Sequence, residues 1–253
     1  MYNFEIEKPA TIDDAVAALT SDEAQALAGG QTLIPTLKAR LAAPEKLISL
    51  TGISELRGIS TDKAGRICIG AGTTHTAVAS GAGAYPALAA LAGQIGDVAV
   101  RNRGTIGGSV ANNDPSACYP AAVLASGAVI VTNTREIGAD DFFDGMFTTA
   151  LEEGEIVTQV RFPVPQQAAY VKFKQPASRF ALVGVFVARF ADGVRVAVTG
   201  ASEEGVFRWG DAEAALSGNF SADALAGLSA STDGLIGDAH GTPQYRAHLI
   251  GVM

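Results

Sequence analysis

The sequence predicts an α+β protein in two parts that meet near residue 165. Before that point, short apolar strands alternate with alanine-rich segments of helical periodicity, which is typical of strand–helix–strand units. After it, two strand-rich runs favour antiparallel pairing, KFKQPASRFALVGVFVARF and VRVAVTGAS, with a kink expected at Gly184. From Asp211 the chain is alanine-rich and helical in pattern. We therefore expect two domains, residues 1–165 and 166–253.

The first predicted unit is a compact βαβ arrangement. A short apolar strand over 24–28 leads into the turn Gly29-Gly30, a helix over 32–41 and a second strand over 46–50. Parallel strands joined through a helix place the intervening turn at the N-terminus of that helix. The glycines therefore lie where backbone N–H groups can face an anion.

Helix-start signals place the next elements. Thr11 and Asp14 form a capping box for a short amphipathic helix. A strand over 66–72 precedes the segment TTHTAVAS, which begins a helix. Pro86 suits the first turn of a second, core-facing helix.

The middle of the chain predicts a helix over 115–124 and a strand over 127–133. A turn-rich piece begins at 140–143. A further strand over 155–162 is closed by Pro163. The run Gly104 to Pro120 extends into the start of the helix expected over 115–124. Its glycines and small polar residues predict a flexible loop.

Composition limits the class of protein. Of the 253 residues, 48% are apolar and 17% charged, which predicts a well-packed globular chain. The net charge of −8 and pI near 4.9 argue against nucleic-acid binding, because that needs clustered lysine and arginine. Small molecules or proteins are the expected partners.

Cys68 and Cys118 are the only cysteines, and their spacing fits neither a structural zinc nor an iron–sulfur cluster. We expect two buried free thiols. The start of the chain, MYNFEIEKPA, has no signal-peptide pattern, and no apolar run reaches the length of a membrane span. These observations predict a cytoplasmic protein.

Two glycine-rich runs are the candidate binding elements, Ala28 to Pro35 and Gly104 to Pro120. Successive N–H groups in such turns form a concavity that holds an anion without lysine. Two concavities predict two phosphates and hence a dinucleotide. The common fingerprints are absent, because no GxxxxGK[ST] occurs and His75 replaces the third glycine of GxGxxG after Gly70 and Gly72.

Two other interpretations stay open. His75 invites a catalytic or ligand role, although a hydrogen-bonded structural histidine is the commoner case. The run Gly107 to Ala111 loosely imitates the GxSxG nucleophile elbow of hydrolases, but its second glycine is alanine.

Five stretches, in order, resemble the FAD-binding medium subunit of the molybdenum hydroxylases. This family includes carbon monoxide dehydrogenase medium chains and is related to the flavin domain of xanthine dehydrogenase. The resemblance runs from about Phe4 to Arg246, and the paired AGGxS/T and TxGG motifs are specific together. The stretches are AGGQTLIPTLKARLA, IGAGTTH, VRNRGTIGGSVANNDPSACYPAAVLASGA, DFFDGMFTTALEEGEIV and KFKQPASRFALVGV.

The resemblance implies a two-part, vanillyl-alcohol-oxidase-like (PCMH-type) FAD-binding domain with subdomains of about 1–56 and 57–165. The C-terminal domain, 166–253, would be of the carbon monoxide dehydrogenase flavoprotein type. The first glycine motif would wrap the pyrophosphate from one side and the second would approach it from the other. By resemblance, the residues that contact FAD are Ala28, Gly29, Gly30, Gln31, Thr32, Leu33, Thr105, Ile106, Gly107, Gly108, Ser109, Asn113, Asp114, Cys118, Val157 and Lys174.

The sequence departs from the family at two positions. Cys118 stands where many relatives have an aspartate that holds the adenosine half, and Arg179 stands where relatives often have an aspartate beside the flavin. The second change would alter the local charge and the reduction potential.

The implied function is an electron-transfer oxidoreductase subunit that takes electrons from a [2Fe–2S] partner to an external acceptor. A large molybdopterin subunit and a small iron–sulfur subunit would complete a dimer of heterotrimers. No catalytic acid or base and no metal ligand is assigned to this chain. The alternative is a structural subunit of the same complex with little or no bound flavin.

Overall fold

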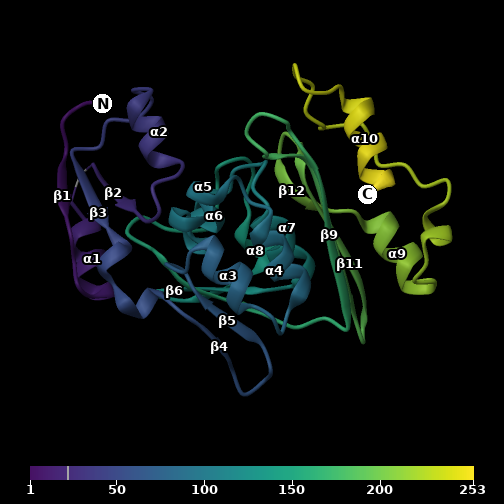
Figure 1. Ribbon diagram of the computed structural model, residues 1–253, viewed down its shortest axis with the longest axis horizontal. Coiled ribbons are helices and arrows are strands. Elements are labelled where there is room, and N and C mark those ends of the chain that lie inside the picture. The colour runs from purple at the N-terminus through teal and green to yellow at the C-terminus, as the bar shows by residue number, and fades with distance from the viewer. Residues whose placement is uncertain (22) are drawn as a thin grey trace.

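The computed structural model describes residues 1–21 and 23–253 and contains three sheets (Figure 1). A three-stranded sheet has the order β1-β3-β2, a five-stranded sheet the order β4-β5-β8-β6-β7, and a four-stranded sheet the order β12-β11-β10-β9. The sheets follow one another along the chain, within residues 5–49, 59–162 and 167–208.

The N-terminal sheet is parallel and confirms the predicted βαβ unit. Its elements are β1 (Glu5–Glu7), α1 (Ile12–Leu19), β2 (Ala24–Leu27), α2 (Leu33–Lys38) and β3 (Lys46–Ser49). Thr11 caps α1 as expected, since its Oγ1 accepts a hydrogen bond from the Asp14 amide at 3.1 Å. Helix α2 is shorter than predicted because Arg40 adopts a left-handed φ of 58° and Leu41 points into solvent.

The central sheet carries the helices that surround the candidate site. Two 3₁₀ turns, Leu50–Gly52 and Ser54–Leu56, lead into it. Its strands are β4 (Ile59–Thr61), β5 (Ile67–Gly70), β6 (Val129–Thr132), β7 (Glu136–Gly138) and β8 (Val157–Phe162), all paired antiparallel. The helices are α3 (His75–Gly81), α4 (Pro86–Gly93), α5 (Val98–Arg103), α6 (Ile106–Asn112), α7 (Tyr119–Ser126) and α8 (Ala139–Phe142).

Two expectations for this region are wrong and a third is confirmed. The run 104–120 is not a flexible loop, because it contains α6, whose first turn is capped by Thr105. The helix expected over 115–124 begins at Tyr119, since Pro115 and the turn closed by Asp114 precede it. The turn-rich piece expected to begin at 140–143 is present: it starts with the single helical turn α8 and continues through turns at 146–147 and 153–154.

The C-terminal sheet is antiparallel, as predicted. Its elements are β9 (Gln167–Lys174), β10 (Ala181–Phe190), β11 (Gly193–Ser202) and β12 (Gly205–Arg208), followed by α9 (Gly210–Gly218), a 3₁₀ turn (Ala222–Leu225) and α10 (Pro243–Val252). The irregularity in β10 lies between Ala181 and Val183 rather than at Gly184. Gly184 instead leaves room for the Tyr170 hydroxyl, which an added Cβ would approach to 2.5 Å.

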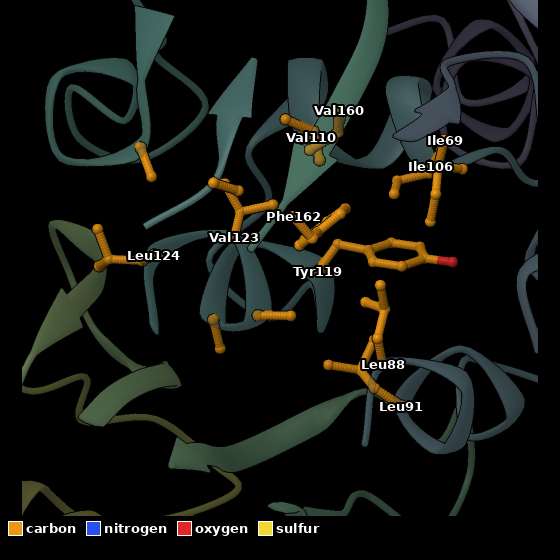
Figure 2. Close-up of a cluster of buried hydrophobic side chains, with 14 of the residues drawn as sticks. Ile69, Leu88, Leu91, Ile106, Val110, Tyr119, Val123, Leu124, Val160 and Phe162 are labelled. Carbon is orange, nitrogen blue, oxygen red and sulfur yellow. The ribbon is translucent and has the colours of Figure 1, made fainter. Parts of the chain in front are cut away.

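Helices fill the space between the central and C-terminal sheets. Helices α4 and α7 pack against β9, β10 and β11, while α9 and α10 cover the other side of that sheet (Figure 1). Figure 2 shows Tyr119 of α7 among Ile106, Leu88 and Leu91 in the largest apolar cluster. Among the described residues, no helix has the length and apolar character to cross a membrane.

Candidate functional site

A cavity of about 1250 Å³ opens among segments from all three sheet regions. Its walls come from the loop after β2, the turns on either side of α5, the segment before α7 and the start of β8, together with parts of the β9–β10 connection. The lining includes 25–33, 71–75, 102–105, 114, 116–118, 155–157 and 178–180. The two predicted glycine motifs therefore meet at one site.

The first motif is an open anion cradle. Residues Gly29 to Leu33 line the cavity, and for their backbone N–H groups no acceptor is found within the described part of the chain. Gly30 has a φ of 72°, which turns the backbone so that successive N–H groups can converge. The Gln31 Nε2 group donates to Gly29 O at 3.2 Å and closes the outer edge of the turn. Five consecutive free donors can hold a phosphate group.

The second motif is mostly a packed helix start. The N–H of Ile106 donates to Thr73 O at 3.1 Å, and the N–H of Gly107 donates to Ala71 O at 2.8 Å. The Gly108 N–H is capped by Thr105 Oγ1 at 3.2 Å. These three amides already have acceptors, so this motif does not present a run of open N–H groups as the first one does, and its approach to the pyrophosphate stays a prediction.

Glycines bring the two motifs into contact. An added Cβ on Gly29 would overlap the carbonyl oxygen of Arg103, and one on Gly104 would come within 2.5 Å of His75 Nε2. Gly107 is closed off by Ala71, whose carbonyl oxygen would lie 2.8 Å from an added Cβ. Close backbone packing explains these glycines as directly as cofactor approach does.

The structure brings most of the predicted site residues to this cavity. Those that line it are Ala28, Gly29, Gly30, Gln31, Thr32, Leu33, Thr105, Gly107, Gly108, Ser109, Asp114, Cys118 and Val157. Ser109 lies inside α6 rather than at a strand–helix turn, so the loose GxSxG match does not form a nucleophile elbow.

Three predicted residues do not line the cavity. Ile106 is fully buried in the core. Asn113 is also buried, and its Nδ2 donates to Gly145 O at 2.7 Å and Thr148 O at 2.8 Å, so it holds a loop behind the wall. Lys174 is exposed near the end of β9, whereas Lys172, on the same face of the strand, lines the cavity.

His75 is a lining residue that sequence reasoning treated as structural. Burial, and secondarily the Arg101 charge, lower the pKa of its imidazole to about 4, so the ring is neutral at physiological pH. Its Nδ1 has no partner within the described residues, and its ring lies 5.4 Å from that of Tyr119. Its position directly after a strand and a Thr-Thr turn was the available signal.

Glu155 is a second lining residue that the sequence did not indicate. Its carboxylate accepts hydrogen bonds from Arg135 Nε at 3.0 Å, Thr132 Oγ1 at 2.7 Å and Thr134 Oγ1 at 2.9 Å. These contacts, the Arg135 bond foremost, lower its pKa to about 2. The carboxylate is therefore ionised, and its charge is balanced by Arg135, which lies outside the cavity lining.

The charge of the lining favours an anion. Its acidic and basic residues other than His75 are Arg57, Arg103, Lys172, Arg179, Asp114 and Glu155. Because Arg135 pairs with Glu155 from outside the lining, the cations outweigh the free carboxylate. Arg179 is exposed with a left-handed φ of 64°, in the turn that joins β9 to β10.

Comparison with known proteins identifies the fold and its ligand class. The family described as the FAD binding domain in molybdopterin dehydrogenase matches residues 2–165. The chain is 34% identical to the carbon monoxide dehydrogenase medium chain of Hydrogenophaga pseudoflava, over 99% of this chain and 94% of that one. It is 33% identical to the nicotine 6-hydroxylase medium subunit of Paenarthrobacter nicotinovorans, over 96% and 91% respectively.

The structural comparison agrees. The carbon monoxide dehydrogenase from Hydrogenophaga pseudoflava that lacks the Mo-pyranopterin moiety of the molybdenum cofactor superimposes with a TM-score of 0.87 and 35% identity. The match covers 100% of this chain and 94% of that one. The α+β, PCMH-type architecture predicted from the sequence is thereby confirmed. The chain belongs to the family of FAD-binding medium subunits of the molybdenum hydroxylases.

Proposed function

We propose that this chain holds FAD in the cavity and carries electrons from a [2Fe–2S] partner subunit to an external acceptor. The chain is an oxidoreductase subunit with an FAD-binding domain. The observation that carries the placement is the run of five backbone N–H groups, Gly29 to Leu33, that line one wall of the cavity and have no acceptor in residues 1–21 and 23–253. When bound, FAD supplies the one- and two-electron chemistry that links single-electron donors to a two-electron acceptor.

The residues of this chain fit that cofactor. The free amides of 29–33 and the surplus of cations suit a pyrophosphate. Leu151, Ile156 and Val157 provide an apolar part of the wall for a flat ring system. In the proposed contact set Lys172 joins the predicted residues, while Ile106, Asn113 and Lys174 act from outside the lining.

The partners follow from the same assignment. The medium chains that this chain resembles are named as parts of carbon monoxide and nicotine oxidising enzymes. We infer a small iron–sulfur subunit and a large molybdopterin subunit, arranged as a dimer of heterotrimers in the cytoplasm. The large subunit would oxidise the substrate. Each of the three sheets lies within one segment of the chain, which supports the proposed division into residues 1–56, 57–165 and 166–253.

The test is the visible absorption spectrum of the purified complex, followed by release and identification of the cofactor. We expect about one FAD per medium chain and co-purification of two further subunits. A complex that lacks flavin, even after incubation with FAD, contradicts the proposal and favours a structural role.

A further inference from the structure

Cys118 and Lys172 form a buried contact between two distant parts of the chain. The Lys172 Nζ lies 3.3 Å from Cys118 Sγ and also donates to Gln94 O at 3.0 Å. Cys118 is 4% exposed at the N-terminal end of α7, and Lys172 is 9% exposed on β9. The second bond of the ammonium group keeps its nitrogen beside the sulfur.

A third polar group lies at the same place. The Tyr170 side chain is 8% exposed, and its hydroxyl has no hydrogen-bond partner among the described residues other than the Cys118 thiol beside it. Burial and then the neighbouring Cys118 raise the pKa of this phenol well above its usual value. The hydroxyl therefore stays protonated and can donate a hydrogen bond to an oxygen atom placed on the sulfur.

Small reagents can reach this pair from the cavity, because both Cys118 and Lys172 belong to its lining. The other cysteine, Cys68, offers an internal comparison. It is similarly buried on β5 but lies outside the lining, and its Sγ donates a weak hydrogen bond to Arg66 O at 3.8 Å, with no lysine nitrogen recorded beside it among the described residues. Burial raises the pKa of the Cys68 thiol, which disfavours its reaction.

We propose that Cys118 and Lys172 are an oxidation-sensitive pair that forms a reversible sulfur–nitrogen cross-link in response to a hydroperoxide. In the first step the Cys118 thiol takes one oxygen from hydrogen peroxide, giving a sulfenic acid and water. The Lys172 nitrogen then attacks the sulfur, the S–O bond breaks, and the S–N bond forms with release of water and one proton. Sulfur loses two electrons and the peroxide gains them.

The cross-link changes the site in two ways. It removes the positive charge of Lys172 from the cavity wall. It also joins the start of α7 covalently to β9, and these two elements lie on opposite sides of the domain boundary proposed near residue 165. Both effects alter the wall that an anionic ligand in the cavity would contact. The reaction needs no bound cofactor, so it does not rest on the proposed function.

The test treats the purified full chain with hydrogen peroxide, then digests it with trypsin without reductant for mass spectrometry. We expect a peptide pair joined through Cys118 and Lys172, with a mass two hydrogen atoms below the sum of its parts. Cleavage after Lys172 is lost, and dithiothreitol restores both peptides. Cys118 reacts at least about tenfold faster than Cys68, because only Cys118 borders the cavity.

Lys172→Arg is the matched variant, since it keeps the charge and the N–H donors but removes the condensing amine. In this variant we expect Cys118 to stop at the sulfenic acid, which dimedone traps. Equal dimedone labelling of the wild type and the variant, with no joined peptide in the wild type, overturns the proposal. Equal reaction rates of Cys118 and Cys68 in the wild type also overturn it, and that comparison needs no variant.

Discussion

The two glycine motifs look alike in sequence and differ in structure. The amides of Gly29 to Leu33 have no acceptor among the described residues, whereas those of Ile106, Gly107 and Gly108 are bonded to Thr73, Ala71 and Thr105. The first motif is an open cradle and the second is a packed helix start that closes against it.

The difference shows that glycine has two uses at this site. Gly30 supplies a left-handed turn for the cradle, at a φ of 72°. Gly107 instead permits close approach of α6 to Ala71 at the end of β5. The presence of glycine in the sequence does not distinguish a left-handed turn from close packing, because both require the absence of a side chain. Substitutions at the two motifs should therefore fail in different ways.

The largest expected effect is on folding, from Gly107→Ala. The added methyl group would overlap Ala71, whose backbone cannot move without disturbing β5, so we expect a loss of about 3 kcal/mol in the free energy of unfolding. Denaturant unfolding measures it. Gly210→Ala, where no atom lies within 4 Å of the added Cβ, is the control and should be neutral or slightly stabilising.

If Gly107 served only to let FAD approach, a side chain there would displace FAD with little loss of fold. A stable Gly107→Ala protein that only loses flavin would restore the simpler view and remove the contrast between the motifs.

The second effect comes from Glu155→Gln. Glu155 borders the cavity, yet Arg135 and two threonines hold its carboxylate, so it belongs with the packed part of the wall. Its pKa falls from 4.5 to about 2 on folding, and the resulting stabilisation is present above pH 4.5 and lost as the pH falls toward 2. We expect the variant to lose about 2 kcal/mol at pH 7.

Urea unfolding at several pH values measures this difference. The gap between wild type and variant should shrink as the pH falls from about 4.5 to about 2. A gap that stays constant over that range would assign the loss to packing rather than to the charge.

The third effect is on binding, from Gln31→Glu. Gln31 is exposed at the cradle, so a carboxylate there repels a phosphate without disturbing the core. We expect FAD affinity to fall about tenfold, close to 1.4 kcal/mol. The free energy of unfolding should fall only slightly, because the one hydrogen bond lost, from Gln31 Nε2 to Gly29 O, is exposed to solvent. Gln244→Glu on α10 makes the same charge change outside the cavity lining and is the control. Equal losses of FAD affinity in both variants would show that the effect comes from the net charge of the chain and not from the position of Gln31.

Much of the fold could be predicted because its signals are local. The capping box at Thr11, the proline at Pro86 and the alternating strands after residue 165 each specify their own element. Helix α6 was missed because two adjacent glycines disfavour a helix, and its stability comes from tertiary contacts with Thr73 and Ala71.

The candidate site could be predicted in outline because its two glycine motifs are also local features of the sequence. The resemblance indicated both motifs, and the structure brings them together at one cavity. It could not show that Lys172 rather than Lys174 lines that cavity, because the two lysines share a face of β9 and differ only in depth. The role of Glu155 depends on Arg135, twenty residues away, and has no local signature.

Hydrogen exchange of the backbone amides, with and without FAD, tests the central contrast most directly. The amides of Gly29 to Leu33 should exchange rapidly in the free chain and become strongly protected when FAD binds. Those of Ile106 to Gly108 should be protected in both states, because their acceptors belong to the protein. Protection gained at 106–108 with no change at 29–33 would contradict the account and assign the phosphates to the second motif.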